Sequence, residues 1–189
     1  TGVWRMLSWG EAMEVFAMDC RGERRDGNYI SPEQMTWLKD GLQSSTAAFK
    51  VILNSVPITD FTGTVIGTIH AADRWQGFEA QRAELLQHIA DQQITGVLWL
   101  TGDFHVGGMI FVDAPGAVAE DVPEIFAGPT GSPINEAAPF INSSTRIPII
   151  IKEHNYTLFE ANPANGRVDI TFIADDGSVN EVDLLVFTP

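Results

Sequence analysis

The sequence has a single cysteine, Cys20, and few basic residues. One cysteine excludes a disulfide within the chain and leaves the redox compartment open, and we expect Cys20 to be a small buried side chain. The 25 acidic residues exceed the 11 lysines and arginines by 14, and basic residues cluster only at Arg21, Arg24 and Arg25. Nucleic acid and anionic membrane surfaces are therefore poor partners for this protein.

Long hydrophobic runs are also missing, because no stretch approaches the roughly 18 apolar residues that suggest a membrane-spanning helix. The chain opens at Thr1 without a Met or a basic-then-apolar leader, so we expect it to be part of a longer parent protein. With 189 residues, of which 44% are hydrophobic, it can bury a substantial core. We treat residues 1–189 as a single domain without repeats.

Apolar runs at 14–18, 49–53 and 96–100 predict three buried strands, each closed by a polar residue. Helical patterns separate them. The first begins at Ser31-Pro32-Glu33-Gln34, where Ser31 is the expected cap, Gln34 is placed to complete a capping box, and the helix ends near Ser45. The alternation of strands and helices predicts an α/β fold, with a mostly parallel sheet and crossover helices.

The second helix is indicated by apolar residues at helical spacing, which extend to about residue 93: Phe78, Leu85, Leu86 and Ile89. Residues 109–113 resemble a strand, and the Pro-, Gly- and Ser-rich stretch up to residue 145 predicts mostly loop. From residue 147 onward short alternating segments, with turns at Asn165-Gly166 and at 175–178, predict a terminal antiparallel meander.

Polar side chains follow each of the three predicted parallel strands. They are Asp19 with Arg21, then Asn54, then Asp103 with His105. Right-handed crossovers bring the carboxyl ends of parallel strands to one edge of the sheet, and ligands bind in the crevice outside that edge. We therefore expect these residues to lie close together although they are far apart in the sequence.

Asp103 and His105 form the sharpest of these elements. Residues two apart on an extended chain point the same way, so the carboxylate and the imidazole are candidate ligands of metal ions. Gly102 leaves room for close approach by a ligand. The alternative is a turn capped by Asp103 beside a surface histidine, because two ligands alone do not make a site.

The other candidates keep two interpretations each. Asn54 either orients a phosphate oxygen or serves as a weak metal ligand, or it is simply a turn residue before Pro57. Arg21 either binds phosphate through its guanidinium or, more simply, forms an ion pair with Asp19. Asp73 either holds its loop against the site or caps the helix region, with capping or packing as the default.

The remaining aromatic and histidine candidates receive simpler roles. Trp75 and Phe78 are expected to be packing residues. No ligand-spaced partner accompanies His70, His88 or His154, so none of them is a predicted metal ligand.

Several sequence blocks follow one another in a characteristic order and spacing over nearly the whole chain. They are Trp9-Gly10, Val15 to Arg21, the Ser-Pro-Glu-Gln-Met-Thr-Trp-Leu-Lys helix start, Phe49 to Pro57, Asp73-x-Trp75-x-Gly77-Phe78 with Arg82, Leu-Thr-Gly-Asp-x-His ending at His105, and the less specific Ala127-Gly128-Pro129 and 155–179. In this series the chain resembles the PhoD-like phosphatases, a branch of the calcineurin-like metallophosphoesterases.

The resemblance implies a β-sandwich flanked by helices, with metals at the strand ends. It implies that Asp103 and His105 are metal ligands, and that Arg21 or Asn54 neutralises charge on a small phosphate ester. The expected reaction is hydrolysis of phosphate mono- or diesters by a metal-activated hydroxide. Iron with calcium, or another pair of divalent ions, is the expected cofactor, and export to an extracytoplasmic compartment is the expected localisation.

Two departures from the family pattern limit how much of the family's metal site can be assigned to this chain. Gln76 stands where the family often has Asp, and no Gly-Asp or Gly-Asn-His-Glu/Asp block precedes Asp103. By this resemblance the chain is a carboxyl-terminal portion of a metallophosphoesterase catalytic domain, which supplies some ligands while the missing amino-terminal portion supplies the others. Three alternatives stay open: a catalytically inactive binding module with the phosphatase fold, an unrelated structural α/β domain, and a metal-dependent esterase for other leaving groups.

Overall fold

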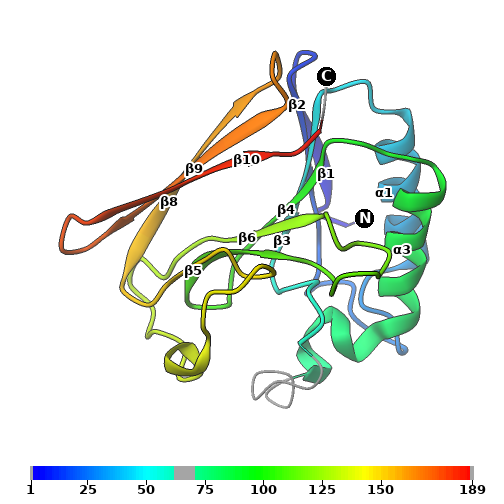
Figure 1. Cartoon of the computed structure of the whole chain (residues 1–189). Helices are drawn as coiled ribbons and strands as arrows, with labels where there is room; N and C mark the ends of the chain where they lie inside the picture. Colours follow the sequence, from blue (N-terminus) through cyan, green and yellow to red (C-terminus); the bar gives the residue numbers. More distant parts are fainter. Residues whose placement is uncertain (1, 62–70, 188–189) are drawn as a thin grey trace.

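A computed structural model describes residues 2–61 and 71–187, which form two β-sheets and two principal helices (Figure 1). The larger sheet has the strand order β1-β2-β3-β4-β6-β5-β7, and the smaller one β10-β9-β8. The strands are β1 (Arg5–Trp9), β2 (Met13–Ala17), β3 (Phe49–Asn54), β4 (Val97–Thr101), β5 (Gly107–Phe111), β6 (Pro123–Phe126), β7 (Ile149–Ile151), β8 (Asn155–Asn162), β9 (Arg167–Ala174) and β10 (Val179–Leu185), and the helices are α1 (Pro32–Ser44) and α3 (Glu79–Asp91).

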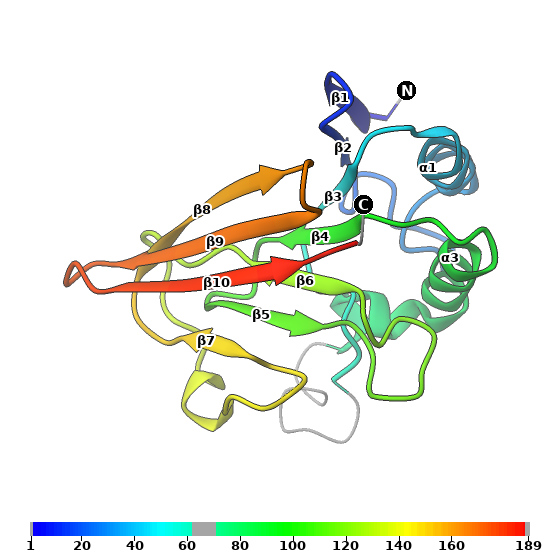
Figure 2. The ribbon, with the colours of Figure 1, turned by 45° about the horizontal axis from the view of Figure 1, so that its top comes forward.

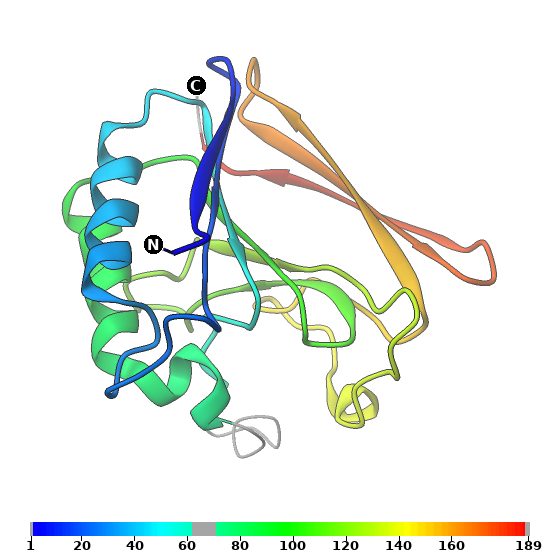
Figure 3. The ribbon, with the colours of Figure 1, turned by 180° about the vertical axis from the view of Figure 1, so that it is seen from behind.

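The elements form three layers, which Figure 3 shows from behind. The two helices cover one face of the larger sheet, and the three-stranded sheet crosses its other face, as Figure 2 also shows. Strands β2, β3, β4 and β6 are parallel, whereas β1, β5 and β7 pair antiparallel. The predicted α/β fold with a mostly parallel sheet and crossover helices is confirmed.

Two hydrophobic clusters hold the layers together. Phe16, Ile52 and Trp99 point from the sheet toward the helices and pack with the apolar sides of both helices. On the opposite face Val51 and Leu98 pack against the small sheet. A sheet covered on both faces explains why these strands are continuously apolar. In the described residues no helix has the length and apolar character needed to cross a membrane.

The start of α1 fastens the loop that follows β2. Ser31 Oγ accepts a hydrogen bond from the Gln34 N–H at 3.1 Å, so the predicted cap is confirmed. The capping box is wrong in its second half, because the Ser31 N–H donates to Glu23 at 3.3 Å. The Gln34 side chain instead bonds the backbone N–H and C=O of Asp19, at 2.8 and 3.1 Å. This contact fixes the point where the chain leaves β2.

Strand β6 was not predicted, because it lies in the stretch that was expected to be mostly loop. It pairs parallel to β4 and antiparallel to β5, in the interior of the larger sheet. Pro123 begins it and Glu124 follows, two residues that are depleted in strands. Glu124 is tolerated because its buried carboxylate accepts hydrogen bonds from the Thr101 hydroxyl and from the N–H groups of Ile58 and Thr59.

The carboxyl-terminal meander is confirmed as β8, β9 and β10, with the turns where they were expected. Val168, Ile170 and Phe172 are buried on the inner face of β9. Gly166 and Gly177 have φ angles of 68° and 83°, a left-handed conformation that explains glycine at both turns. Residues 149–151 differ from the prediction, because they join the larger sheet beside β5 as β7.

The amino-terminal strand β1 was not predicted either. It pairs antiparallel with β2 at the edge of the larger sheet and is exposed along its whole length. With both faces of the strand in contact with water, its side chains lack the alternation that would reveal a half-buried strand.

Candidate metal and phosphate site

The carboxyl ends of β2, β3 and β4 lie at the same edge of the larger sheet. Ala17 is in register with Leu53, and Leu53 with Leu100. The loops after these strands carry Asp19 with Arg21, Asn54, and Asp103 with His105. The predicted gathering of these polar residues at one edge is therefore confirmed, since it follows from the parallel order of the strands.

A cleft of about 430 Å³ opens at this edge. Asp103 and His105 line it together with residues from the loops on either side, namely Val56, Pro57, Asp73, Arg74, Phe104, Asn135, Glu136 and Ala137. Asp103 and His105 thus share a cavity of the size that small ligands occupy.

The backbone that presents Asp103 and His105 is not extended, as the prediction assumed. Both residues have left-handed φ angles, 58° and 59°. Such angles are uncommon for residues other than glycine, and strained residues of this kind concentrate at functional sites. His105 Nε2 nevertheless lies 3.9 Å from Asp103 Oδ1, so the two side chains face each other. The two side chains are therefore neighbours, as predicted, but the left-handed backbone brings them together and not an extended one.

The contacts of His105 fit a metal ligand. Its Nδ1 lies 2.7 Å from the carbonyl oxygen of Pro133, which can only accept, so Nδ1 carries the proton and donates. In the neutral imidazole this places the lone pair on Nε2, the nitrogen on the side of Asp103. A histidine oriented by a backbone carbonyl through one nitrogen, with the other free to coordinate, is the usual arrangement around protein-bound metals.

Asp103 and His105 supply only part of the ligand set of a metal site. Within residues 2–61 and 71–187 no group of three or more His, Cys, Asp or Glu side chains is arranged to hold a metal ion. Asp103 and His105 provide one oxygen and one nitrogen donor, whereas zinc sites, for example, take three or four ligands from the protein. The residues present therefore fit a metal that is also coordinated by groups beyond those that the structure describes.

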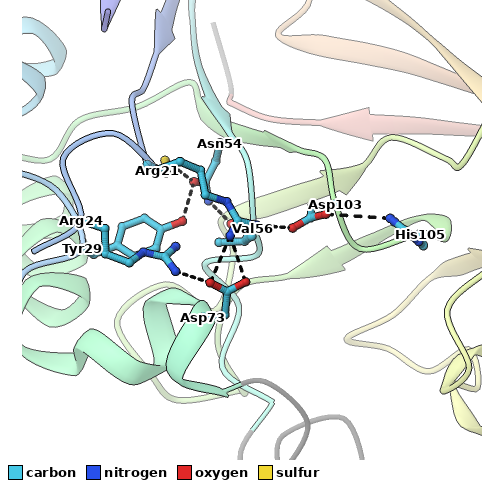
Figure 4. A network of polar contacts seen from close by, with 9 residues as sticks. Arg21, Arg24, Tyr29, Asn54, Val56, Asp73, Asp103 and His105 are labelled. Atoms are coloured by element: carbon cyan, nitrogen blue, oxygen red, sulfur yellow. Dashed lines mark hydrogen bonds and ion pairs between the residues drawn. The ribbon is translucent and has the colours of Figure 1, made fainter. Parts of the chain in front are cut away.

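Arg21 bridges Asp73 and Asp103, two half-exposed residues of the cleft lining that we call the cleft mouth. Its Nη2 donates to Asp103 Oδ2 at 2.5 Å, and its Nη1 donates to both carboxylate oxygens of Asp73, at 3.1 and 3.2 Å (Figure 4). The predicted ion pair with Asp19 is wrong, because the Asp19 carboxylate accepts from the Gly22 N–H at 2.7 Å and serves its own turn. Arg21 thus lies directly beside a candidate metal ligand.

Asp73 binds arginines instead of capping a helix, so the default interpretation is wrong. It ends the short helix η1 (Ala71–Asp73), and its carboxylate accepts from Arg21 and from Arg24. Partial burial raises the pKa of Asp73, but hydrogen bonding and charge from Arg24 and Arg21 outweigh it and hold the pKa below the ordinary value. Arg24 was missed as a site residue, although its place in the only basic cluster of the sequence was a signal.

The lowered pKa of Asp73 gives a direct test of this contact. Because the folded-state pKa lies below the ordinary 3.8, its contribution to stability is complete above pH 3.8 and is lost as the pH falls through the lowered value. We expect Arg24→Gln to move the pKa of Asp73 up toward 3.8, measured by carboxyl ¹³C NMR titration. Arg167→Gln, which breaks a distant ion pair with Asp183, is the control and should change nothing at Asp73. A wild-type pKa at or above 3.8 would contradict the geometry.

Asn54 is buried at the end of β3 and is not part of the lining of the cleft that contains Asp103 and His105. Its Oδ1 accepts from Cys20 Sγ at 3.1 Å and from Trp75 Nε1 at 3.3 Å, and its Nδ2 donates to the Val56 carbonyl. These contacts tie the ends of β2 and β3 to the loop before α3. The expectations that Cys20 and Trp75 are buried are confirmed. The catalytic role of Asn54 stays a prediction.

Of the other described histidines, neither His88 nor His154 is a candidate ligand of the site. His88 is in α3, and His154 Nε2 contacts the Ser132 carbonyl at 3.0 Å. Neither lines the cavity that contains His105. His70 lies outside the described residues.

Fold and site together define a layered α/β sandwich with a carboxylate–imidazole pair and an arginine at the strand ends. Residues 1–180 match the family described as PhoD-like phosphatase. The chain belongs to the PhoD-like phosphatase family.

Three individual proteins show the extent of the similarity. Alkaline phosphatase D of Bacillus subtilis (strain 168) is 34% identical over 77 residues, which are 40% of this chain and 13% of that protein. A solved structure of PhoD has a TM-score of 0.75 at 19% identity, over 97% of this chain and 41% of that chain. GAP50, the anchor in the inner membrane complex of Plasmodium, has a TM-score of 0.60 at 13% identity, over 98% and 54%. The chain thus spans less than half the length of the PhoD structure.

Proposed function

We propose that this chain supplies part of the active site of a metal-dependent phosphoric ester hydrolase that acts on phosphate mono- or diesters. The observation that carries the proposal is the arrangement of Asp103, His105 and Arg21 at one cleft. A carboxylate oxygen and an imidazole nitrogen lie 3.9 Å apart, and a guanidinium nitrogen lies 2.5 Å from the other oxygen of the same carboxylate. Membership in a phosphatase family supports phosphoester hydrolysis.

Each side chain has a distinct role in this proposal. Asp103 and His105 hold the metal, and the Pro133 carbonyl keeps the His105 ring in the orientation and tautomer that leave Nε2 free. When bound, the metal would act as a Lewis acid and supply a nucleophile at neutral pH. Arg21 binds phosphate oxygens through its planar guanidinium. It also provides a local positive charge in a chain whose formal net charge of −14 repels an anionic substrate at long range.

The remaining metal ligands come, in this proposal, from the amino-terminal portion of the parent protein. The PhoD structure supports this, because this chain covers only 41% of it. A second cavity of about 460 Å³ opens between the two sheets and is lined by Leu53, Leu100 and Phe159 among others. This apolar opening at the site edge is where we place the additional segment. Iron with calcium or another divalent pair, and an extracytoplasmic location, belong to the same proposal by family likeness.

The isolated chain tests the division of the site. Because it provides two metal donors, we expect it to hydrolyse an aryl phosphate no faster than its Asp103→Ala variant, in the presence of added iron, calcium, zinc or manganese. The parent protein, assayed in parallel, should turn over the same substrate. Robust metal-dependent turnover by the isolated chain that disappears in Asp103→Ala would show that the site is complete within these 189 residues.

A further inference from the structure

We propose that Asp73 is a positioning residue that holds Arg21 at the cleft mouth in readiness for the phosphate group. The inference rests on the proposed function, since it concerns how Arg21 reaches its substrate. Arg21 is exposed, with 53% of its side chain accessible, so a long flexible chain must be ordered before it can bind. Asp73 orders the Arg21 side chain by accepting hydrogen bonds from Nη1 with both of its carboxylate oxygens.

Asp73 can do this because it is itself held by Arg24. The Arg24 Nη1 donates to Asp73 Oδ1, and only 18% of the Arg24 side chain is exposed. The Arg24 guanidinium lies over the Tyr29 ring at 4.7 Å and near the Phe78 ring at 5.6 Å. Cation–π contacts of this kind stabilise a desolvated guanidinium.

The chain of contacts starts in the hydrophobic core. Tyr29 is fully buried, and its ring packs against Trp75 at 4.3 Å and Phe78 at 5.5 Å. Core packing therefore fixes Arg24, Arg24 fixes Asp73, and Asp73 fixes Arg21. The close-up in Figure 4 shows the last two contacts, with Asp73 below the Arg21 guanidinium, Arg24 on the left, and Asp103 and His105 on the right.

Asp73 also counters the electrostatic attraction of Arg21 to Asp103. Arg21 bridges two carboxylates, one on each side of the guanidinium. Without the charge on Asp73, Arg21 would be left without an acidic partner once Asp103 coordinates a cation. With Asp73 present, the guanidinium remains at the mouth when Asp103 coordinates a cation. An arginine ordered in advance binds phosphate at a smaller entropic cost.

The test compares Asp73→Asn, Arg21→Ala and the double variant in the parent protein. We expect Asp73→Asn to raise KM for an aryl phosphate and the inhibition constant of inorganic phosphate about tenfold, with kcat within about threefold and metal content unchanged. In the Arg21→Ala background Asp73→Asn should have no further effect, because the residue acts through Arg21. Glu84→Gln, which breaks an ion pair between the helices far from the cleft, is the matched control.

The kinetic results that would overturn the inference are equally specific. Unchanged KM and inhibition constants in Asp73→Asn would remove the positioning role. Effects of Asp73→Asn that add fully to those of Arg21→Ala would show that Asp73 acts independently. Loss of metal from Asp73→Asn would make it a ligand instead.

A second measurement separates this inference from the proposed function. In the isolated chain, ¹⁵N spectra of the Arg21 guanidinium should show restricted rotation that is lost in Asp73→Asn and kept in Glu84→Gln. If the parent protein hydrolysed no phosphate ester while this difference were present, the function would fail and the positioning of Arg21 would stand. Identical Arg21 spectra in the wild type and Asp73→Asn would overturn the positioning, whatever the activity.

Discussion

Replacing His105 by alanine in the parent protein should remove both bound metal and phosphatase activity. In the proposed site His105 offers Nε2 to the metal beside Asp103, so its loss would leave the cation short of a ligand. Replacing a group that only orients a metal ligand typically costs about 10–100-fold in metal affinity or activity, and loss of a direct ligand should exceed that range. Elemental analysis of the purified protein and turnover of an aryl phosphate measure the two effects. Asp103→Ala should behave in the same way.

His154 provides a matched control for this experiment. Its side chain is about as exposed as that of His105, 39% against 36%. It also contacts a backbone carbonyl, that of Ser132 at 3.0 Å, and has a carboxylate, Asp175, at 4.0 Å. Because it lies outside the cleft, His154→Ala should keep full metal content and activity. Full metal content in both Asp103→Ala and His105→Ala would make the Leu-Thr-Gly-Asp-x-His block a structural turn.

Replacing Glu124 by alanine should destabilise the fold by about 3–5 kcal/mol. The substitution leaves three buried donors without their acceptor, the Thr101 hydroxyl and the N–H groups of Ile58 and Thr59. Each buried group left unsatisfied costs about 1–3 kcal/mol, and a domain of this kind is stable by only about 5–15 kcal/mol. Denaturant unfolding of the isolated chain measures the difference.

The control for Glu124 is a glutamate that is exposed. Glu84 forms a surface ion pair with Lys39 at 2.8 Å, and such pairs contribute about 0–1 kcal/mol. Glu84→Ala should therefore change stability by less than about 1 kcal/mol. If Glu124→Ala lowered the free energy of unfolding as little as Glu84→Ala, the hydrogen bonds that Glu124 accepts from residues 58 and 59 would not stabilise the fold as stated.

Continuous apolar runs made much of the fold predictable. The segments 49–53 and 96–100 could be placed in a covered parallel sheet because both of their faces are apolar. Strand β6 could not be predicted, because Pro123 and Glu124 have low strand propensity. Long-range hydrogen bonds to the Glu124 carboxyl group allow the strand to form there. Local preference failed there because long-range contacts decide the conformation of this segment.

The site was predictable to the extent that topology determines it. The order of parallel strands was enough to bring Asp103, His105, Asn54 and Arg21 to one edge. The hydrogen-bond partners of each side chain could not be predicted, because they depend on loop conformations. Arg21 was assigned to its sequence neighbour Asp19, whereas it pairs with residues 52 and 82 positions away.

A structure of the metal-loaded parent protein, with anomalous scattering to locate the metals, tests the central claim most directly. We predict a metal bonded to His105 Nε2 at about 2.0–2.2 Å and to an Asp103 carboxylate oxygen, with its other ligands from the amino-terminal portion. His105 Nδ1 should keep its hydrogen bond to the Pro133 carbonyl. Fully occupied metals in the cleft with neither Asp103 nor His105 among their ligands would contradict the account.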